Sequence, residues 1–235
     1  MNYKIGIDNL SFSYKKDIVI KDVSLKIAAN DVVGILGHNG AGKTTLFRLM
    51  LGILKPKNGT IIFGQDKGKR NVLSFLPDNN GLYGKLTAYE NLMFRSKIYN
   101  LNLPNTNEVI NATLRDFNLH DQMCKQVRML SNGQKKRVAL AATIMIDSDI
   151  IVLDEPTTGI DPESMKILGD QILKLRSTGR TILISSHDLD FISKIASKVI
   201  ILQNGKVVYD NTLDTANDSL NQIYLRHTLD TAISD

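Results

Sequence analysis

Residues 37–45 read Gly37-His38-Asn39-Gly40-Ala41-Gly42-Lys43-Thr44-Thr45 and match the pattern G-x-x-x-x-G-K-[ST]. Before them, residues 31–36 are mostly apolar and β-branched, which predicts a short buried strand. After them, residues 44–51 carry apolar side chains at helical spacing, and Gly52 suits the end of a helix. The pattern therefore predicts a phosphate-binding loop between a strand and a helix.

Each part of this loop has a physical reason to bind phosphate. The glycines let the backbone turn tightly and present its N–H groups to phosphate oxygens. The following helix adds the positive end of its dipole, roughly half a unit charge. We expect Lys43 to reach the β- and γ-phosphates of a nucleotide, and the Thr44 hydroxyl to ligate Mg²⁺. All the loop residues from Gly37 to Thr45 are candidate nucleotide contacts.

The composition limits the kind of protein. With 235 residues, the chain is long enough for one large domain or two modest ones. The single cysteine, Cys124, excludes an internal disulfide framework and fits a reducing compartment. The longest apolar run, residues 138–146, is far shorter than the ~20 residues of a membrane span, so any membrane role would involve another chain. Residues 1–5 lead straight into a predicted strand, and we expect no N-terminal signal.

The net charge of +5 permits an anionic partner without naming one. The basic clusters lie at residues 15–16, 67–70 and 135–137. None is interleaved with aromatic residues in the manner of a nucleic-acid stacking surface. We interpret most of them as solvated faces and expect no nucleic-acid partner.

Hydrophobic periodicity predicts an α/β fold. Strands at residues 3–14 and 18–27, joined by a short polar link, predict an antiparallel β layer ahead of the phosphate loop. Further strands are expected at residues 60–63, 72–76, 150–153 and 181–185, followed by a hairpin of 198–202 and 206–209 that turns at Asn204-Gly205. Helices are expected at residues 87–99, 105–118, 131–146, 161–177 and 188–196.

The three helices between residues 78 and 146 interrupt the alternation of strands and helices. This predicts a P-loop core with a mostly parallel sheet, the N-terminal antiparallel layer and an inserted α-helical subdomain. We place the core at residues 1–77 and 147–210 and the helical subdomain at 78–146. The tail, residues 211–235, is polar with a weak helical period, and the sequence assigns it no role.

Two acidic residues follow the apolar strand 150–153. Ligands bind at the carboxyl ends of strands in open α/β sheets, which is where Asp154 and Glu155 would stand. We expect Asp154 to orient Mg²⁺, directly or through water, and Glu155 to act as general base on the attacking water. His187 also ends a strand at this edge and would face the γ-phosphate. By themselves, such carboxylates are more often a helix cap or a surface pair, and a lone histidine is usually structural.

Several segments together carry a resemblance to a known family: Tyr14, GHNGAGKT at 37–44, LSNGQ at 130–134, IIVLDE at 150–155, Gly159-Ile160-Asp161 and Ser186-His187. Their order resembles the ATPase domain of ATP-binding cassette (ABC) proteins over residues 1–210. The LSNGQ segment, similar to the family's LSGGQ signature, separates it from other phosphate-loop ATPases.

The resemblance implies a head-to-tail dimer that sandwiches two ATP molecules. Each site would take its phosphate loop from one protomer and the signature residues Ser131, Gly133 and Gln134 from the other. The resemblance also implies adenine stacking by Tyr14, catalysis by Glu155, an inter-protomer contact by Asp161 and γ-phosphate sensing by His187. On the residues alone, Tyr14 is as well explained as a core or hairpin tyrosine.

The chain departs from the family pattern at two positions. Asp78 stands where the family usually has a glutamine that touches Mg²⁺ and signals to the membrane partner. Its shorter, anionic side chain reaches the metal only if the loop moves closer or a water intervenes. Asn132 replaces the first glycine of the signature, which is tolerable if its side chain points away from phosphate.

The leading hypothesis is an ATP-hydrolysing motor subunit of a membrane transporter, bound at the cytoplasmic face of the membrane through a separate transmembrane permease. Residues 81–92 resemble cassettes of drug, antibiotic or lipid efflux systems, which implies an exporter. An alternative is a soluble ABC ATPase that acts on the ribosome or nucleic acid, although such relatives generally carry tandem cassettes or long coiled coils. A third is a nucleotide-binding regulator without turnover, which the presence of Lys43, Asp154, Glu155 and His187 disfavours.

Overall fold

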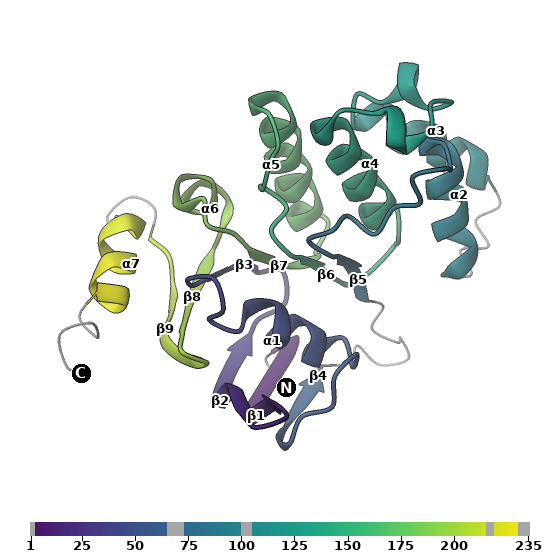
Figure 1. The fold of residues 1–235 in the computed structure, drawn as a ribbon. Coiled ribbons are helices and arrows are strands. Elements are labelled where there is room, and N and C mark those ends of the chain that lie inside the picture. The colour runs from purple at the N-terminus through teal and green to yellow at the C-terminus, as the bar shows by residue number, and fades with distance from the viewer. Residues whose placement is uncertain (1–2, 65–72, 100–104, 215–218, 230–235) are drawn as a thin grey trace.

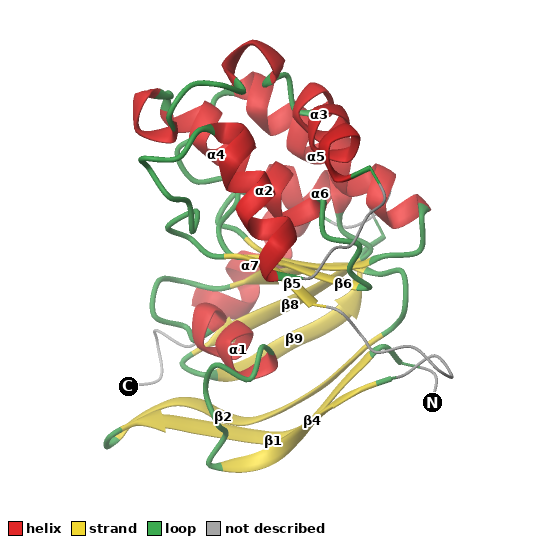
Figure 2. Cartoon of the chain, turned by 90° about the vertical axis from the view of Figure 1, so that its right-hand side faces the viewer, coloured by secondary structure: helices red, strands yellow, loops and turns green. Residues whose placement is uncertain are grey.

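The computed structural model describes residues 3–64, 73–99, 105–214 and 219–229. These residues form three layers, which Figures 1 and 2 show from two directions. Helices cover one face of a six-stranded sheet, and the helix α1 (Lys43–Met50) lies between the other face and a three-stranded sheet. The predicted α/β class with a mostly parallel sheet and an N-terminal antiparallel layer is confirmed.

The six-stranded sheet is parallel except for its last strand. In spatial order its strands are β5 (Leu73–Leu76), β6 (Ile150–Leu153), β7 (Thr181–Ser185), β3 (Val32–Leu36), β8 (Lys198–Gln203) and β9 (Lys206–Thr212). The inner strands are almost entirely buried apolar runs, as a parallel sheet covered on both faces requires. The strand predicted at 72–76 begins at Leu73, and Val72 lies outside the described residues.

The predicted hairpin between β8 and β9 is confirmed. Its turn residues Asn204 and Gly205 both have positive φ, 49° and 79°. These values match the type I′ turn, whose twist fits antiparallel strands. β9 therefore adds one antiparallel strand to the edge of the parallel sheet.

The smaller sheet is antiparallel and has the order β2 (Asp17–Ile27), β1 (Ile5–Tyr14), β4 (Asn58–Phe63). The two N-terminal strands were predicted to form this layer, and this is confirmed. Membership of β4 was not predicted, because its short run shows only that it is a strand and not which strand it pairs with.

Residues 78–146 contain α2 (Ala88–Ile98), α3 (Thr106–Asp116), α4 (Asn132–Ile144) and two short 3₁₀ turns, His120–Gln122 and Val127–Met129. Both predicted capping boxes are present. Thr87 and Glu90 close the N-terminus of α2, and Ser131 and Gln134 close that of α4. The division of the chain into subdomains stays a proposal.

Three further helices flank the larger sheet: α5 (Pro162–Ser177), α6 (Leu189–Ile195) and α7 (Leu220–Leu229). As predicted, α5 begins with Asp161 as N-cap and proline in the first turn. The sequence did not predict α7; Gln203 Nε2 donates a hydrogen bond to Thr228 O at 3.1 Å and so ties it to β8. No helix in the described residues is long and apolar enough to cross a membrane.

The sheet order decides where the polar residues meet. β6, β7 and β3 are neighbours and run parallel, so their carboxyl ends lie at one edge. The phosphate loop follows β3, Asp154 follows β6 and His187 follows β7. Three segments far apart in the sequence thereby converge.

Candidate nucleotide-binding site

The loop at residues 37–45 connects β3 to α1 as predicted. Gly37 has φ 152°, and a Cβ there would lie 2.3 Å from Leu202 O, so a side chain does not fit. No side chain caps the N-terminus of α1 after Gly42. The first-turn N–H groups of α1 and its dipole thus face the concave side of the loop, an arrangement suited to an anion.

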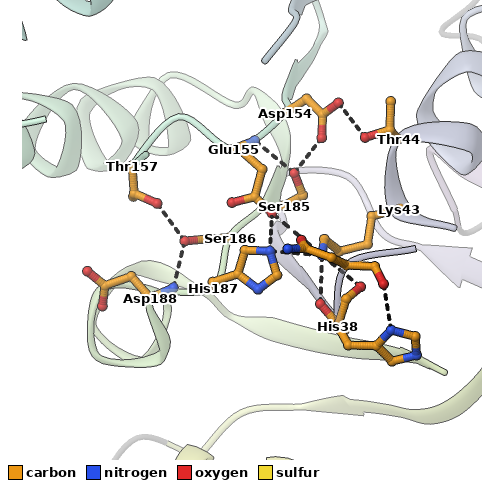
Figure 3. A network of polar contacts seen from close by, with 12 residues as sticks. His38, Lys43, Thr44, Asp154, Glu155, Thr157, Ser185, Ser186, His187 and Asp188 are labelled. Atoms are coloured by element: carbon orange, nitrogen blue, oxygen red, sulfur yellow. Dashed lines mark hydrogen bonds and ion pairs between the residues drawn. The ribbon is translucent and has the colours of Figure 1, made fainter. Parts of the chain in front are cut away.

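Lys43 lies under the loop with its ammonium turned back to it (Figure 3). Its Nζ donates hydrogen bonds to Gly37 O at 2.6 Å and to His38 O at 3.4 Å. The residue is 6% exposed. Burial lowers the pKa of the Lys43 ammonium, and the nearby carboxylates of Glu155 and Asp154 oppose that shift.

Thr44 and Asp154 are joined by their side chains. Thr44 Oγ1 donates to Asp154 Oδ2 at 2.8 Å, and Ser185 Oγ donates to Asp154 Oδ1 at 2.7 Å. Asp154 is 1% exposed, and a buried carboxylate needs such donors. The first helical turn of α1 and the ends of β6 and β7 therefore meet on one side chain.

Glu155 stands between two basic groups. Its Oε1 lies 3.1 Å from His187 Nε2 and 3.5 Å from Lys43 Nζ, and these two nitrogens are 3.4 Å apart. The Glu155 side chain is 14% exposed, and apart from these ion pairs its buried oxygens make no hydrogen bond to the described residues. A carboxylate in this position is close to the loop and not locked by hydrogen bonds.

The segment that carries His187 is fixed by Ser186. Its Oγ lies 2.7 Å from Thr157 Oγ1, and it accepts a hydrogen bond from the Asp188 N–H at 3.0 Å. Asp188 in turn caps α6 by accepting from the Phe191 N–H at 2.8 Å. The histidine itself is half-exposed, which leaves it free to approach a ligand.

Gly37 and His38 meet this cluster of acids and bases only through their carbonyl oxygens, which accept from Lys43 Nζ. His38 is exposed, and its Nδ1 lies 2.7 Å from Asn39 O. Tyr14 ends β1 with 40% exposure, its ring edge-on to Phe12 at 4.9 Å between centroids. An exposed tyrosine at a hairpin is compatible with both interpretations made from the sequence, so adenine stacking stays a prediction.

The signature residues lie at the start of α4. Ser131 Oγ accepts from the Gln134 N–H at 3.2 Å, and Gln134 Oε1 accepts from the Ser131 N–H at 3.1 Å. Gly133 packs against the cap of α5, where a Cβ would lie 2.1 Å from Asp161 Oδ2. Packing within one chain is thus enough to explain a glycine at position 133. The family resemblance implies a ligand contact in addition.

Asp78 is exposed, two residues after the end of β5. It forms no ion pair within 4.0 Å in the part of the chain that the structure describes. Its proposed contact with Mg²⁺ therefore stays a prediction.

Sequence reasoning missed the hydrogen bonds of Ser185 and the burial of Lys136. Ser185 was predicted as the end of a strand, but its hydroxyl also accepts a hydrogen bond from the Glu155 N–H at 2.8 Å. Lys136 was counted in a basic cluster, yet it is only 3% exposed. Nothing in the strand pattern singled out the first, and nothing in the helical pattern singled out the second.

A phosphate loop, its lysine and two strand-end carboxylates on a mostly parallel sheet define a P-loop nucleotide-binding protein. A family model described as "ABC transporter" matches residues 20–158, more than half of the chain. The chain belongs to the ABC transporter family, whose ATP-binding subunits couple ATP hydrolysis to transport. A model of AAA domains also matches residues 126–193.

Individual relatives also belong to the ABC transporter family. The chain is 36% identical to "ABC transporter ATP-binding protein NatA" of Bacillus subtilis (strain 168) over 228 residues, covering 91% of this chain and 93% of that protein. It is 34% identical to "SkfA peptide export ATP-binding protein SkfE" of the same organism, covering 87% of each. A solved structure described as "Structure of ATP binding subunit of ABC transporter" matches with a TM-score of 0.85 and 26% identity, covering 95% of this chain and 98% of that one.

A second solved structure, cbiO1 from Clostridium perfringens, is described as part of the ABC transporter complex cbiONQ. It matches with a TM-score of 0.76 and 25% identity over 99% of this chain and 95% of that chain. The predicted family, fold and ATPase activity are confirmed.

Proposed function

We propose that this chain is the motor subunit of an exporter, hydrolysing ATP with Mg²⁺ while bound to a separate transmembrane permease. The main observation in support of ATP hydrolysis is that Glu155 lies against Lys43 and His187, beside the phosphate loop. Phosphoryl transfer needs a phosphate cradle, a metal and a group that positions or deprotonates water. The site offers a residue for each.

The residues of the site are suited to Mg²⁺ that binds together with ATP. The described residues contain no cluster of three or more His, Cys, Asp or Glu that would hold a metal by itself. Mg²⁺ typically takes only one or two protein oxygens and completes its shell with phosphate and water. Thr44 Oγ1 and Asp154 Oδ2, 2.8 Å apart, supply that number. When bound, the metal would neutralise charge on the β- and γ-phosphates.

The remaining residues act on the γ-phosphate and water. Lys43, already directed at the loop, binds phosphate oxygens. Its present partner Glu155 is itself an anion, so the incoming phosphate competes with that carboxylate for the Lys43 ammonium. Glu155, released from this pair, then accepts a proton from the attacking water. His187 Nε2 donates to the γ-phosphate and reports its presence.

The second half of the site comes from a second ATPase subunit. α4 is 13 residues long, and the exposed Ser131 marks its N-terminus. Helix N-termini attract anions, and a hydroxyl there can bond a γ-phosphate across an interface. We propose that Ser131, Gly133 and Gln134 of one subunit complete the phosphate loop of the other.

A cleft of about 600 Å³ beside the Asp78 segment suits the permease. Its lining includes Ile53, Phe63, Phe75, Pro77, Arg95 and Tyr99. Among the described lining residues Arg95 is the one with a charged side chain, and its Nη2 donates to Phe75 O at 2.8 Å. A short amphipathic helix of the permease with an acidic residue would match this apolar lining with a single cation. Binding there would hold the chain at the cytoplasmic face of the membrane.

The proposed direction of transport, export, is based on similarity to other proteins. The SkfE relative is named for peptide export, and residues 81–92 resemble efflux cassettes. Reconstituted vesicles that show ATP-driven movement away from the ATPase side would support this direction. Movement toward the ATPase side would overturn it.

The chemical part of the proposal is tested by Glu155→Gln. This variant should lose ATP hydrolysis by at least about 100-fold, the size of a general-base effect, and form a lasting ATP-bound dimer in gel filtration. ATP should bind it more tightly, because the competing carboxylate is gone. Glu163→Gln is the matched control, since Glu163 also pairs with a basic residue, Arg137, at 3.2 Å. Unchanged turnover in Glu155→Gln would remove Glu155 from this role.

The partner is tested by recovering tagged Glu155→Gln protein with ATP from detergent-solubilised membranes. A polytopic membrane protein in stoichiometric amount is expected. Ile53→Arg should abolish this recovery without affecting ATP binding, whereas Ile18→Arg should not; both isoleucines are 60% exposed. Recovery of ribosomes or nucleic acid without a membrane protein would favour the soluble alternative.

A further inference from the structure

The Asn204-Gly205 turn between β8 and β9 is a feature of the chain that the proposed chemistry does not use. In the fold, this turn lies beside β2 and contacts the phosphate loop (Figure 1). The Gly205 N–H donates a hydrogen bond to Ala41 O at 3.2 Å, and Gly205 O accepts one from the Lys21 N–H at 2.8 Å. One residue of the turn therefore joins the phosphate loop to β2.

The contact is a close approach of backbones, which explains a glycine at position 205. Gly205 has φ 79°, and a Cβ there would lie 2.3 Å from Val19 O. The phosphate loop comes similarly close to its neighbours. A Cβ on Gly37 would lie 2.3 Å from Leu202 O, and one on Gly42 would lie 3.1 Å from Val19 O. The loop is thus packed between the backbones of β2 and the end of β8.

The hydrogen bond from Gly205 sets the direction of one peptide group in the loop. Ala41 is 0% exposed, and a buried carbonyl oxygen needs a donor. The described residues contain no cis peptide bond, and in a trans peptide the C=O and the next N–H point in opposite directions. Because Ala41 O is held toward the turn, the Gly42 N–H is directed away from it. Gly42 is the N-cap of α1, whose N-terminal N–H groups are the donors expected to meet phosphate.

We propose that Gly205 is a positioning residue for the phosphate loop. By donating to Ala41 O, it holds the Gly42 N–H in the direction that binds phosphate before the nucleotide arrives. This inference deepens the proposed function and rests on nucleotide binding at this loop. A loop that is already ordered binds its ligand more tightly, because less conformational entropy is lost on binding. The turn therefore raises the affinity of the site for the phosphates.

The first test is the affinity of the full-length protein for ATP with Mg²⁺, measured by calorimetry. Gly205→Ala places a Cβ against Val19 O and moves the N–H of residue 205 away from Ala41 O. It should weaken ATP binding about ten-fold, the effect of one weakened hydrogen bond to a charged group.

Gly179→Ala is the matched control for strain in a turn. Gly179 also has positive φ, 86°, and its N–H also donates to a backbone carbonyl, Arg176 O at 3.0 Å, in the turn between α5 and β7. A loss of stability without a positioning role would affect ATP binding in both variants alike, whereas we expect Gly179→Ala to bind ATP as the wild type does. Wild-type affinity in Gly205→Ala, or an equal loss in Gly179→Ala, would overturn the proposal.

A second measurement uses the wild-type chain and needs no substitution. Amide hydrogen exchange followed by NMR reports how often the Gly205 N–H loses its bond to Ala41 O. Coupling between two sites is reciprocal, so ATP with Mg²⁺ should slow exchange of the Gly205 N–H about ten-fold more than exchange of the Gly179 N–H. Equal slowing of both amides would show only the general stabilisation that any ligand brings, and it would contradict the coupling.

Spectra of the ligand-free protein separate this inference from the proposed function. The amide NMR signal of Gly42 should shift in Gly205→Ala and stay in place in Gly179→Ala. If the wild-type chain does not bind ATP but this shift is present, the proposed function fails while the contact between turn and loop stands. If the wild-type chain binds ATP and the Gly42 signal is unmoved by Gly205→Ala, the function stands and the positioning role fails.

Discussion

Ser185 holds Glu155 by its backbone: Ser185 Oγ accepts a hydrogen bond from the Glu155 N–H at 2.8 Å. The same hydroxyl donates to Asp154 Oδ1 at 2.7 Å, so one side chain orients both acidic residues. Glu155 has φ 48°, a left-handed conformation that is unfavourable for a residue with a side chain. The Ser185 bond helps to maintain this conformation, which aims the Glu155 carboxylate at Lys43 and His187.

Replacing Ser185 by alanine should therefore lower kcat about 10-fold or more and leave the KM for ATP within about two-fold, because a lost positioning contact acts on the chemical step. Steady-state ATPase kinetics measure both constants. Ser74→Ala is the matched control: Ser74 is equally buried and pairs with Ser148 at 2.8 Å, away from the acids. The same kcat in Ser185→Ala as in Ser74→Ala would contradict a positioning role.

Lys43→Ala should weaken ATP binding at least about 10-fold and abolish measurable hydrolysis, since it removes the cation expected to meet the phosphates. Equilibrium binding of a fluorescent ATP analogue measures the first effect. Lys57→Ala is a suitable comparison, because Lys57 Nζ also donates to a backbone carbonyl, Lys15 O at 3.3 Å, but on an exposed surface. Full ATP affinity in Lys43→Ala would exclude Lys43 from phosphate binding.

Gly133→Ala should destabilise the ligand-free protein by about 1–3 kcal/mol, as expected for an overpacked contact. The new Cβ would overlap Asp161 Oδ2, whose side chain caps α5. Asp161→Ser shortens that side chain and retains a capping oxygen, so the double variant should recover most of the loss in urea unfolding. If Asp161→Ser brings no recovery, the clash is not the cause.

The cap on α5 also predicts a dependence on pH. Hydrogen bonds from the Ser164 N–H and hydroxyl hold the pKa of Asp161 below its usual range. A carboxyl with a lowered pKa stabilises the folded protein above its unfolded pKa, near 4, and this contribution is lost as the pH falls through the folded value. Asp161→Ala should thus cost about 1 kcal/mol at pH 7, with the difference from wild type shrinking below pH 4.

Asp161→Asn provides the control for this pH dependence. Asparagine caps helices about as well as aspartate but does not titrate. Its free energy of unfolding relative to Asp161→Ala should therefore stay constant between pH 3 and 7. A difference that changes with pH in the same way for both caps would assign the effect to another group.

Much of the fold and part of the site could be predicted because the signals are local. The phosphate loop depends on glycine positions and a lysine within nine residues, and the helix starts at Thr87, Ser131 and Asp161 depend on caps four residues long. Asp154 and Glu155 were found because a buried parallel strand is a run of apolar residues that ends abruptly. Each of these patterns needs only its own segment.

The remainder depends on contacts between distant segments. β4 joins β1 across about 50 residues, and α7 is held by bonds such as that from Gln203 to Thr228 O. Ser185 matters only because β7 brings it to the acids that follow β6. Contacts between segments that are far apart in the sequence leave no local pattern, so they could be seen only in the fold.

The position of β3 in the sheet has a consequence for the newly made protein. β3 carries the phosphate loop, yet its partners are β7 and β8, which begin at residues 181 and 198. On the ribosome, at about 5–20 residues per second, this apolar strand waits several seconds or longer for its first neighbour to be synthesised. Nucleotide binding therefore begins only when most of the chain has emerged, and until then the strand is a natural target for chaperones that shield exposed apolar segments.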